Sequence, residues 1–375
     1  MKQPCFLFAM IALFGLTFTM PRAALAAGAM DEAALGFGLY CATFETEAET
    51  TAFIAKCREF GVRALFPSLS GGSTVYWKTD RESLGAVYKR GLDEGYDSLA
   101  SMIERAHAVG IAVYPSVAVG PAGKLLEQNP EWETRDREGR ASSETTTRSV
   151  SLAYPEARAA KVRLLMDLVE GYAVDGVMLD YCRYPETTAQ PKTAYGFYGY
   201  DPPLIQACLA IYGFDPREVP IDSPEWMLFN DMRSASVTTF VGEFRAAVMR
   251  SGKHIRVGGF GDTDPERERR MCGRDCPGWA RAGLIDDYFL ATYNDTIEEM
   301  PAKVSQARQL AGDKVMLRSS LAPFNRFLTT NEQMIAAGKA QLAGGADGLW
   351  IYRSDFLEDL GLWPGAAAAS QLTPQ

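Results

Sequence analysis

The stretch Tyr172-Ala173-Val174-Asp175-Gly176-Val177-Met178-Leu179-Asp180-Tyr181-Cys182-Arg183-Tyr184-Pro185 is typical of a buried strand that leaves a parallel sheet. An Asp-Gly turn precedes the apolar run, which stops at an acid, an aromatic residue, a base and a proline. In a parallel α/β barrel the carboxyl ends of the strands form the active face. The stretch therefore predicts that Asp180, Tyr181 and Arg183 line a site if the chain folds as such a barrel. The structural alternative is a solvated acid at a strand end, paired with Arg183.

Segments on both sides of this stretch alternate between strand and helix patterns. Strands are predicted over residues 36–44, 61–67, 111–115, 255–260, 285–293, 314–319 and 346–352. Helices are predicted over residues 47–60, 98–109, 155–172, 229–250, 301–311 and 331–343. Residues 279–282 are predicted to be the end of a further helix. Eight strands separated by helices, without a low-complexity linker, predict an α/β fold: one (β/α)8 TIM barrel with long insertions after its strands, over residues 31–365. A doubly wound sheet is the alternative, but no Gly-x-Gly-x-x-Gly follows the first strand.

Two long insertions are expected near the carboxyl ends of the strands. Residues 68–96 are rich in Gly, Ser and Tyr, and their Tyr76-Trp77 pair either stacks on a ligand or pins the loop to the barrel. Residues 195–203 are rich in aromatic residues and proline. They form either a wall of a cleft or a surface subdomain with a small core of its own.

The N-terminal residues have the pattern of a secretory signal peptide over residues 1–26. Lys2 precedes an apolar run from Phe6 to Met20, and the run is followed by Ala24-Leu25-Ala26. We therefore expect a secreted or periplasmic protein. The later helical segments carry charges every few residues, so no membrane span is expected after the signal.

Charge and composition exclude several classes of function. A net charge of −9 and a pI near 5.0 argue against nucleic acid or anionic membrane as the main partner. The two histidines, His107 and His254, are expected on the flank or N-terminal face of the barrel, which argues against a Ser-His-Asp triad or a zinc site. The sequence contains no phosphate-binding glycine motif, so no nucleotide cofactor is expected. In an oxidising compartment, Cys272 and Cys276 are the best candidates for a local disulfide.

Carboxylates and aromatic residues recur at the predicted strand ends. The carboxylates are Asp180, Asp262, Asp264, Asp295 and Asp355, and the aromatic residues are Tyr40, Tyr114, Tyr181, Tyr293, Trp350 and Tyr352. Glycoside hydrolysis uses two carboxylates, one to protonate the leaving oxygen and one to attack or to activate water, and sugar faces stack on rings. This pattern predicts a glycosidase that acts without a metal.

We assign roles to these residues as predictions. Asp180 is the principal catalytic carboxylate, a nucleophile or base because Arg183 would keep it ionised. Asp262 is the second carboxylate, although it is equally suited to capping the segment that follows. Substrate contacts are predicted for Tyr40, Tyr114, Tyr181, Arg183, Tyr293, Arg318, Trp350 and Tyr352. Trp77 and Tyr198 lie on loops long enough to fold over the site.

The chain also resembles the secreted glycoside-hydrolase-like TIM-barrel family 10 over nearly its whole length after the signal. The matching segments are Tyr96-Asp97-Ser98-Leu99, residues 106–111, Asn129-Pro130-Glu131-Trp132 with Asp136 and Gly139, residues 172–185, residues 279–293 and residues 344–348. The resemblance implies a (β/α)8 barrel that acts on polysaccharide or peptidoglycan-like glycans. Two positions depart from the family: Ala291-Thr292 stands where a Gln usually precedes the aromatic residue, and Gly258-Gly259 replaces a Ser-Pro pair. A barrel that binds glycans without cleaving them is the alternative.

Overall fold

A closed barrel of parallel strands organises the computed structural model, which describes residues 37–186 and 197–372. The strands are β1 (Phe37–Cys41), β2 (Ala64–Pro67), β6 (Ala112–Val113), β7 (Ser116–Ala118), β8 (Gly176–Asp180), β9 (Arg256–Asp262), β10 (Asp287–Ala291), β11 (Met316–Leu321) and β12 (Gly348–Ile351). Their order in the sheet is β6-β2-β1-β12-β11-β10-β9-β8-β7. β6 and β7 are two parts of one strand, because Ser116 pairs with Ser68 on one side and with Met178 on the other. The sheet thus closes on itself, and the predicted eight-stranded barrel is confirmed.

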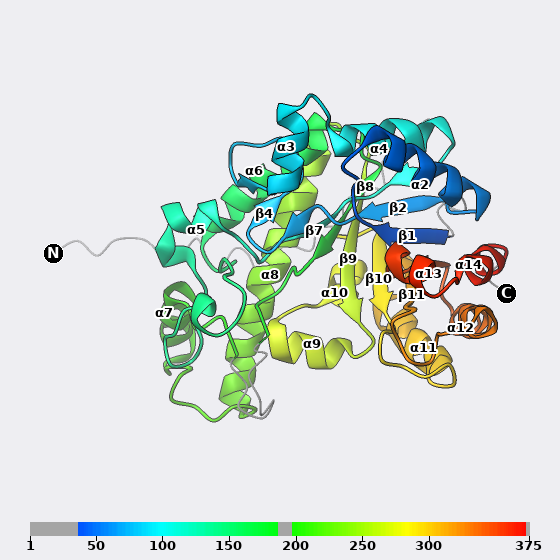
Figure 1. Ribbon diagram of the computed structural model, residues 1–375. Coiled ribbons are helices and arrows are strands. Elements are labelled where there is room, and N and C mark those ends of the chain that lie inside the picture. Colours follow the sequence, from blue (N-terminus) through cyan, green and yellow to red (C-terminus); the bar gives the residue numbers. More distant parts are fainter. Residues whose placement is uncertain (1–36, 187–196, 373–375) are drawn as a thin grey trace. The chain divides into compact units, whose positions relative to one another are not determined.

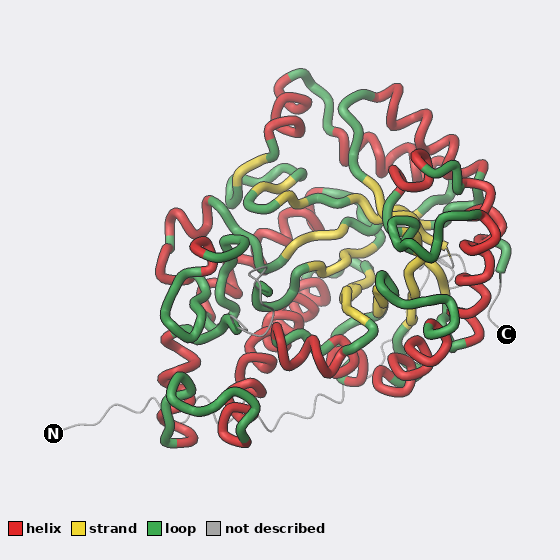
Figure 2. Tube along the Cα trace, turned by 60° about the horizontal axis from the view of Figure 1, so that its bottom comes forward, coloured by secondary structure: helices red, strands yellow, loops and turns green. Residues whose placement is uncertain are grey.

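Helices cover the outside of the barrel, as Figures 1 and 2 show. The helices of the barrel are α2 (Glu47–Glu59), α4 (Ser98–Ala108), α6 (Pro155–Gly171), α8 (Pro224–Arg250), α10 (Cys276–Arg281), α11 (Met300–Ala311), α12 (Asn331–Ala343) and α14 (Trp363–Ser370). Further helices lie in the loops after strands: α3 (Ala86–Asp93), α5 (Lys124–Gln128), α7 (Pro202–Tyr212), α9 (Pro265–Cys272), α13 (Ser354–Asp359) and the 3₁₀ turns η2 (Pro130–Trp132) and η3 (Ser142–Glu144). Local sequence sets their starts: Thr46 and Thr330 form capping boxes with the third residues of α2 and α12.

Glycines on the strands make room for aromatic rings inside the barrel. A Cβ atom on Gly38 would lie 2.2 Å from the Phe66 ring, and one on Gly258 would lie 2.4 Å from the Phe289 ring. The rings of Phe66 and Phe289 are 5.0 Å apart and meet edge to face. Because side chains alternate between the two faces of a strand, these residues point into the barrel and fill it as a packed core.

A buried ion cluster fills the end of the barrel nearest the starts of the strands. Asp287 accepts from Arg256 at 2.7 Å and from Arg318 at 2.6 Å. Burial alone would raise the pKa of Asp287, but the two guanidinium groups hold it below its ordinary value. On the same side of the barrel, His107 Nε2 lies 2.8 Å from Asp175 Oδ2, just before β8. This end of the barrel is therefore structural.

The first insertion packs onto the barrel and does not hang free. It contains a small sheet of β3 (Ser70–Gly71), β4 (Thr74–Val75) and β5 (Ser83–Leu84). Trp77 is only 1% exposed. It lines a cavity of about 10 Å³ together with Glu82 and Lys161, enough room for about one water molecule. Trp77 therefore pins the loop to the barrel and is not exposed for stacking on a ligand.

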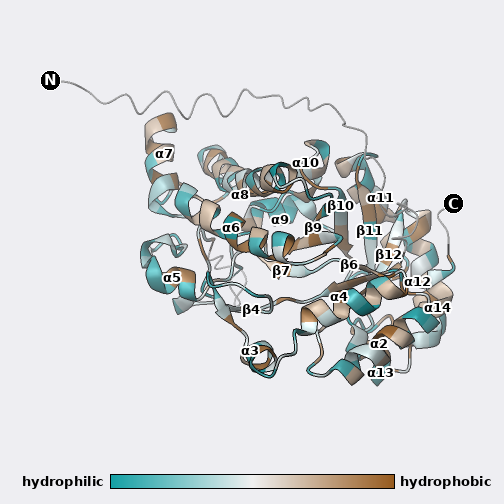
Figure 3. Cartoon of the chain, turned by 90° about the horizontal axis from the view of Figure 1, so that it is seen from above, coloured by the Kyte–Doolittle hydropathy of each residue, from teal (hydrophilic) through white to brown (hydrophobic). Residues whose placement is uncertain are grey.

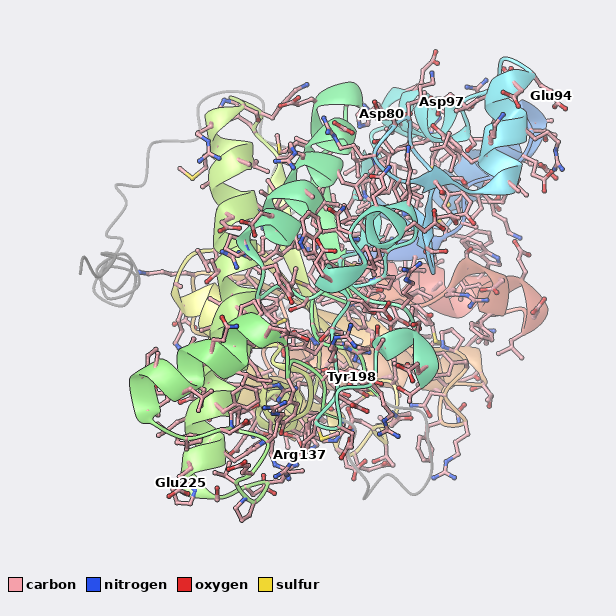
Figure 4. All side chains as sticks on the ribbon, turned by 90° about the vertical axis from the view of Figure 1, so that its left-hand side faces the viewer. Asp80, Glu94, Asp97, Arg137, Tyr198 and Glu225 are labelled. Carbon is pink, nitrogen blue, oxygen red and sulfur yellow. The ribbon has the colours of Figure 1, made fainter. Side chains whose placement is uncertain are left out.

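The second insertion builds a small core against α8. Phe197 packs on Trp226 at 5.1 Å between ring centroids, and the Trp226 Nε1–H donates to the Tyr200 hydroxyl. Tyr198 is also buried, so its side chain is not exposed on a loop that folds over the site. Tyr195 and Gly196 lie outside the described residues. Figure 4 shows Tyr198, Arg137 and Glu225 well separated from Asp80 and Asp97. The two insertions thus occupy different parts of the barrel rim.

The predicted disulfide is wrong. Cys272 and Cys276 are free and buried, as are the other cysteines among the described residues. The Cys272 thiol donates to the Glu268 carbonyl oxygen at the end of α9, whereas the Cys276 thiol donates to the Phe260 carbonyl oxygen on β9. The turn at Gly273, with φ +74°, directs the two side chains to different neighbours.

Apolar residues concentrate on the central strands, and hydrophilic ones are frequent on peripheral helices such as α5 and α9 (Figure 3). Within the described ranges, none of the helices is long and apolar enough to cross a membrane. The predicted signal peptide lies outside the described residues.

Candidate active site

Asp180 is the last residue of β8 and lies at the open end of the barrel, partly exposed. Its Oδ1 atom accepts a hydrogen bond from the Tyr181 backbone N–H at 2.7 Å. Burial raises the pKa of Asp180 above its ordinary value; Arg274 and, more weakly, Arg183 oppose this rise. A carboxyl group with a raised pKa retains its proton longer and is suited to donate it.

The residues directly after Asp180 adopt an unusual backbone. Tyr181 has φ +45°, a left-handed conformation that is rare for an aromatic residue, and its side chain is 48% exposed. Arg183 lies over the Tyr181 ring at 5.2 Å and forms an ion pair with Glu186 at 3.1 Å. Arg183 therefore shares its charge with another carboxylate, and the expectation that it keeps Asp180 ionised is not supported by the raised pKa of that group.

Asp262 is the last residue of β9, the strand next to β8, and is also partly exposed. Its Oδ1 atom accepts from the backbone N–H of Thr263 at 2.6 Å and from the Thr263 hydroxyl at 3.2 Å. The residue that caps α9 is Asp264, whose side chain accepts from the Arg267 N–H. Asp262 is thus held in one orientation without being used as the helix cap.

A buried ion pair lies behind these two carboxylates. Glu268 on α9 and Arg274 are 3% and 5% exposed, and they form a two-pronged contact in which Arg274 Nε donates to Glu268 Oε2 at 2.9 Å. The same Oε2 atom accepts from the backbone N–H of Asp262 at 3.0 Å. Arg274 also lies over the Phe260 ring at 5.5 Å. This pair ties α9 to the end of β9. Figure 1 shows the two elements, α9 and β9.

Aromatic rings line the other side of the opening. Tyr352 lies 4.9 Å from Tyr40 and 4.9 Å from Tyr293, measured between ring centroids. Phe324, in the loop after β11, meets Tyr293 edge to face at 5.2 Å. After burial, the charge of Asp180 is the next cause that raises the pKa values of Tyr40 and Tyr293. The row of rings Tyr40-Tyr352-Tyr293-Phe324 therefore begins close to Asp180; we call it the aromatic row.

Several buried polar atoms around the opening lack a partner among the described residues. They are the Tyr293 hydroxyl, Asp295 Oδ2 and Arg183 Nε. An unsatisfied buried polar atom costs stability, and such atoms concentrate where a ligand or water completes the bonding. At this face a polar ligand or water can complete their bonding.

The structure divides the predicted site residues into two groups. Asp180, Asp262, Tyr40, Tyr181, Arg183, Tyr293 and Tyr352 gather at the open end. The other three are buried inside the barrel: Tyr114 is 1%, Arg318 2% and Trp350 0% exposed. Arg318 belongs to the ion cluster, and Trp350 donates to its carbonyl oxygen. Burial and, after it, the charge of Asp287 raise the pKa of Tyr114. These three belong to the core beneath the open end.

Sequence reasoning missed Glu268, Arg274 and Phe324. The first two lie in a helix and the turn after it, where charged residues ordinarily face solvent, so no local signal marked them. Phe324 could have been found, because Pro323-Phe324-Asn325 follows the seventh strand and belongs to the same set of loops. Within the part of the chain that is described, no group of three or more His, Cys, Asp or Glu side chains is arranged to hold a metal ion.

Comparisons with known proteins agree with this architecture. The glycoside hydrolase domain of PgaB (BpsB) from Bordetella bronchiseptica is similar in structure, with TM-score 0.69 and 14% identity over 90% of this chain and 99% of that one. A β-amylase catalytic domain from Paenibacillus polymyxa has TM-score 0.62 and 12% identity over 86% and 93% of the two chains. A β-galactosidase from Marinomonas ef1 has TM-score 0.63 and 13% identity over 90% and 59%. At these identities the likeness shows the fold alone.

The sequence itself decides the family. No curated protein matches the chain. The family model described as glycosyl hydrolase-like 10 matches residues 39–320, which include β8, β9, β10 and most of β11. The chain belongs to the glycosyl hydrolase-like 10 family.

Proposed function

We propose that the protein is a glycoside hydrolase that cleaves a polysaccharide or cell-wall glycan at the open end of its barrel, with Asp180 as a catalytic carboxylate. The observation that carries the proposal is the position of Asp180, with its raised pKa, beside the aromatic row and the unpartnered Tyr293 hydroxyl. Rings supply the apolar surface on which a sugar face stacks, and the carboxyl supplies the proton that the leaving oxygen needs. Membership of a glycosyl hydrolase-like family and a barrel shared with glycosidases support this class of reaction.

Asp180 acts as the proton donor in this proposal, and Asp262 acts as nucleophile or base. The two residues end adjacent strands, so their carboxylates can flank one glycosidic bond. Burial raises the pKa of Asp180, which favours its protonated form, and Thr263 holds the Asp262 carboxylate in place. Which of the two stereochemical outcomes follows depends on the separation of the carboxyl groups.

The test begins with a screen of the purified protein against cell-wall and exopolysaccharide fractions, with calorimetry for binding and chromatography for released sugars. On the fraction that is cleaved, Asp180→Asn should lower the rate by about 10²–10⁴-fold, because a general acid is lost, while the thermal melting temperature stays near that of the wild type. Asp359→Asn is the control, since Asp359 is an exposed carboxylate at the end of α13. Wild-type turnover by Asp180→Asn would refute the assignment.

A barrel that binds glycans without cutting them would present the same rings. It is distinguished by the same screen, because it predicts binding with no released sugar on every fraction that binds. Export to the periplasm or the medium is part of the proposal and is supported by the signal pattern in residues 1–26.

A further inference from the structure

The exposed side chain of Phe324 is the feature of the open face that the catalytic proposal does not use. Phe324 is 41% exposed, although its ring meets Tyr293 at 5.2 Å, Tyr352 at 5.7 Å and Phe356 at 5.7 Å. The contacts with Tyr293 and Tyr352 are edge to face, at 73° and 75° between ring planes. The three neighbours thus hold the ring in place and leave much of it open to solvent.

The turn that presents Phe324 is rigid. Asn325 is 5% exposed, and its side chain bonds in two directions: Oδ1 accepts from the Phe327 N–H at 3.0 Å, and Nδ2 donates to the Asp295 carbonyl oxygen at 3.2 Å. Its backbone N–H donates to Ala322 at 2.8 Å, and its carbonyl oxygen accepts from Leu328, which is fully buried. A preorganised apolar surface loses little entropy when it binds a ligand.

Polar groups belong to the neighbours of this ring. Asn325 ties the Phe324 turn to the backbone oxygen of Asp295, and Tyr293, whose ring contacts Phe324, carries the hydroxyl without a partner among the described residues. An apolar platform bordered by hydrogen-bonding atoms matches a pyranose ring, which has an apolar C–H face and hydroxyl groups at its edge. Phe324 is also one ring further from Asp180 than Tyr293 is along the aromatic row.

We infer that Phe324 is the platform of a second sugar-binding subsite. The glycan then contacts the protein through at least two consecutive sugar residues, and it runs from Asp180 across Tyr293 to the loop after β11. The inference rests on the proposed function for the class of ligand, and it adds that the ligand is an oligosaccharide or a polysaccharide segment. A purely structural role is a poorer account of the ring, because Tyr293 is already packed by Phe260 and Trp350.

Binding as a function of chain length tests this subsite. Calorimetry would measure the affinity for di-, tetra- and hexasaccharides prepared from cellulose, chitin, amylose and peptidoglycan glycan strands. For the series that the wild type binds, Phe324→Ala should weaken binding of the tetra- and hexasaccharides about tenfold and binding of the disaccharide less than about twofold, because only the longer chains reach the second platform. Phe324→Trp should restore the affinity, since it keeps a flat apolar face.

Tyr212→Ala is the matched control. Tyr212 on α7 is also 41% exposed and stacks on one aromatic neighbour, Phe214, at 6.0 Å. Figure 1 shows α7 on the opposite side of the barrel from α13. This variant should bind all lengths as the wild type does.

The outcomes separate the two proposals. Unchanged affinity of Phe324→Ala for the longer chains, or an equal loss for all lengths, overturns the subsite and leaves the proposed function standing. A fall in the urea unfolding midpoint of Phe324→Ala that Phe324→Trp does not reverse also overturns it, because the ring would then be structural. If the wild type binds none of the four series, both the subsite and the proposed glycan-binding function are contradicted for these glycans.

Discussion

At the scale of single residues, the Tyr293 hydroxyl offers the cleanest separation of binding from stability. The hydroxyl is buried without a partner, and the ring packs on Phe260, Phe324, Trp350 and Tyr352. Tyr293→Phe keeps these ring contacts and removes a polar atom that the fold does not satisfy. We expect its melting temperature to equal or exceed that of the wild type, while glycan affinity falls about tenfold through the loss of one hydrogen bond. A lower melting temperature would show that the hydroxyl bonds within the protein.

Glu268 is expected to act on both stability and the charge state of Asp180. Glu268→Gln leaves Arg274 buried without its counter-charge, which should lower the free energy of unfolding by about 3–5 kcal/mol. It also removes a negative charge that raises the pKa of Asp180 and retains the cation that lowers it, so the pKa of Asp180 should fall. Urea unfolding and carboxyl ¹³C NMR, with the Asp180 signal assigned by Asp180→Asn, measure the two effects.

Glu266→Gln is the control for this variant. Glu266 lies on the same helix, α9, but is exposed. It should change neither quantity. An identical response of the two variants would mean that the ion pair does not influence Asp180.

At the scale of elements, a buried lysine of α6 and a glutamate of the first insertion both bond to the loop after β7. Lys161 is 2% exposed, and its Nζ atom donates to the Pro121 carbonyl oxygen at 2.6 Å. Glu82, on the insertion, accepts from the backbone N–H groups of Gly123 and Lys124. Burial lowers the pKa of Lys161 to about 8, against the opposing charge of Glu82. The contact between α6 and the loop after β7 should therefore depend on pH.

The direction of that dependence follows from proton binding. Between pH 8 and the ordinary lysine pKa of 10.5 the unfolded chain holds more protons on Lys161 than the folded one, so stability rises with pH in this window. From pH 7 to pH 9.5 the wild type should gain about 2 kcal/mol in unfolding free energy relative to Lys161→Met. Urea unfolding of both proteins at several pH values measures the difference, and parallel profiles would contradict the lowered pKa.

At the scale of the whole molecule, closure of the barrel determines which side chains can meet a ligand. The interior is filled by rings that fit against Gly38, Gly176 and Gly258, and the end nearest the strand starts is filled by the ion cluster around Asp287. Of the two ends of the barrel, the one at the carboxyl ends of the strands is left for binding. Pairing of β1 with β12, the first and last strands in the chain, also brings Tyr40 against Tyr352. The aromatic row exists because these two strands are neighbours in the sheet.

The sequence by itself determined the eight strands, most of the helices and the strand ends that carry Asp180 and Asp262. This follows because a strand buried on both faces requires a continuous apolar run, and because helix starts require side chains that bond free backbone N–H groups. Both requirements act over a few neighbouring residues and are therefore legible in the sequence. The family resemblance rests on the same local segments.

Only the tertiary structure decided how deeply each side chain is buried and which side chains contact one another. Tyr114 and Arg318 belong to strand segments with the predicted pattern, but their distance along the barrel axis places them in the core. The pairing of Glu268 with Arg274, the separation of Cys272 from Cys276 and the exposure of Phe324 depend on contacts between segments that the chain brings together in space. Burial, and with it the raised pKa of Asp180, is set by atoms far away in the sequence, which no local pattern records.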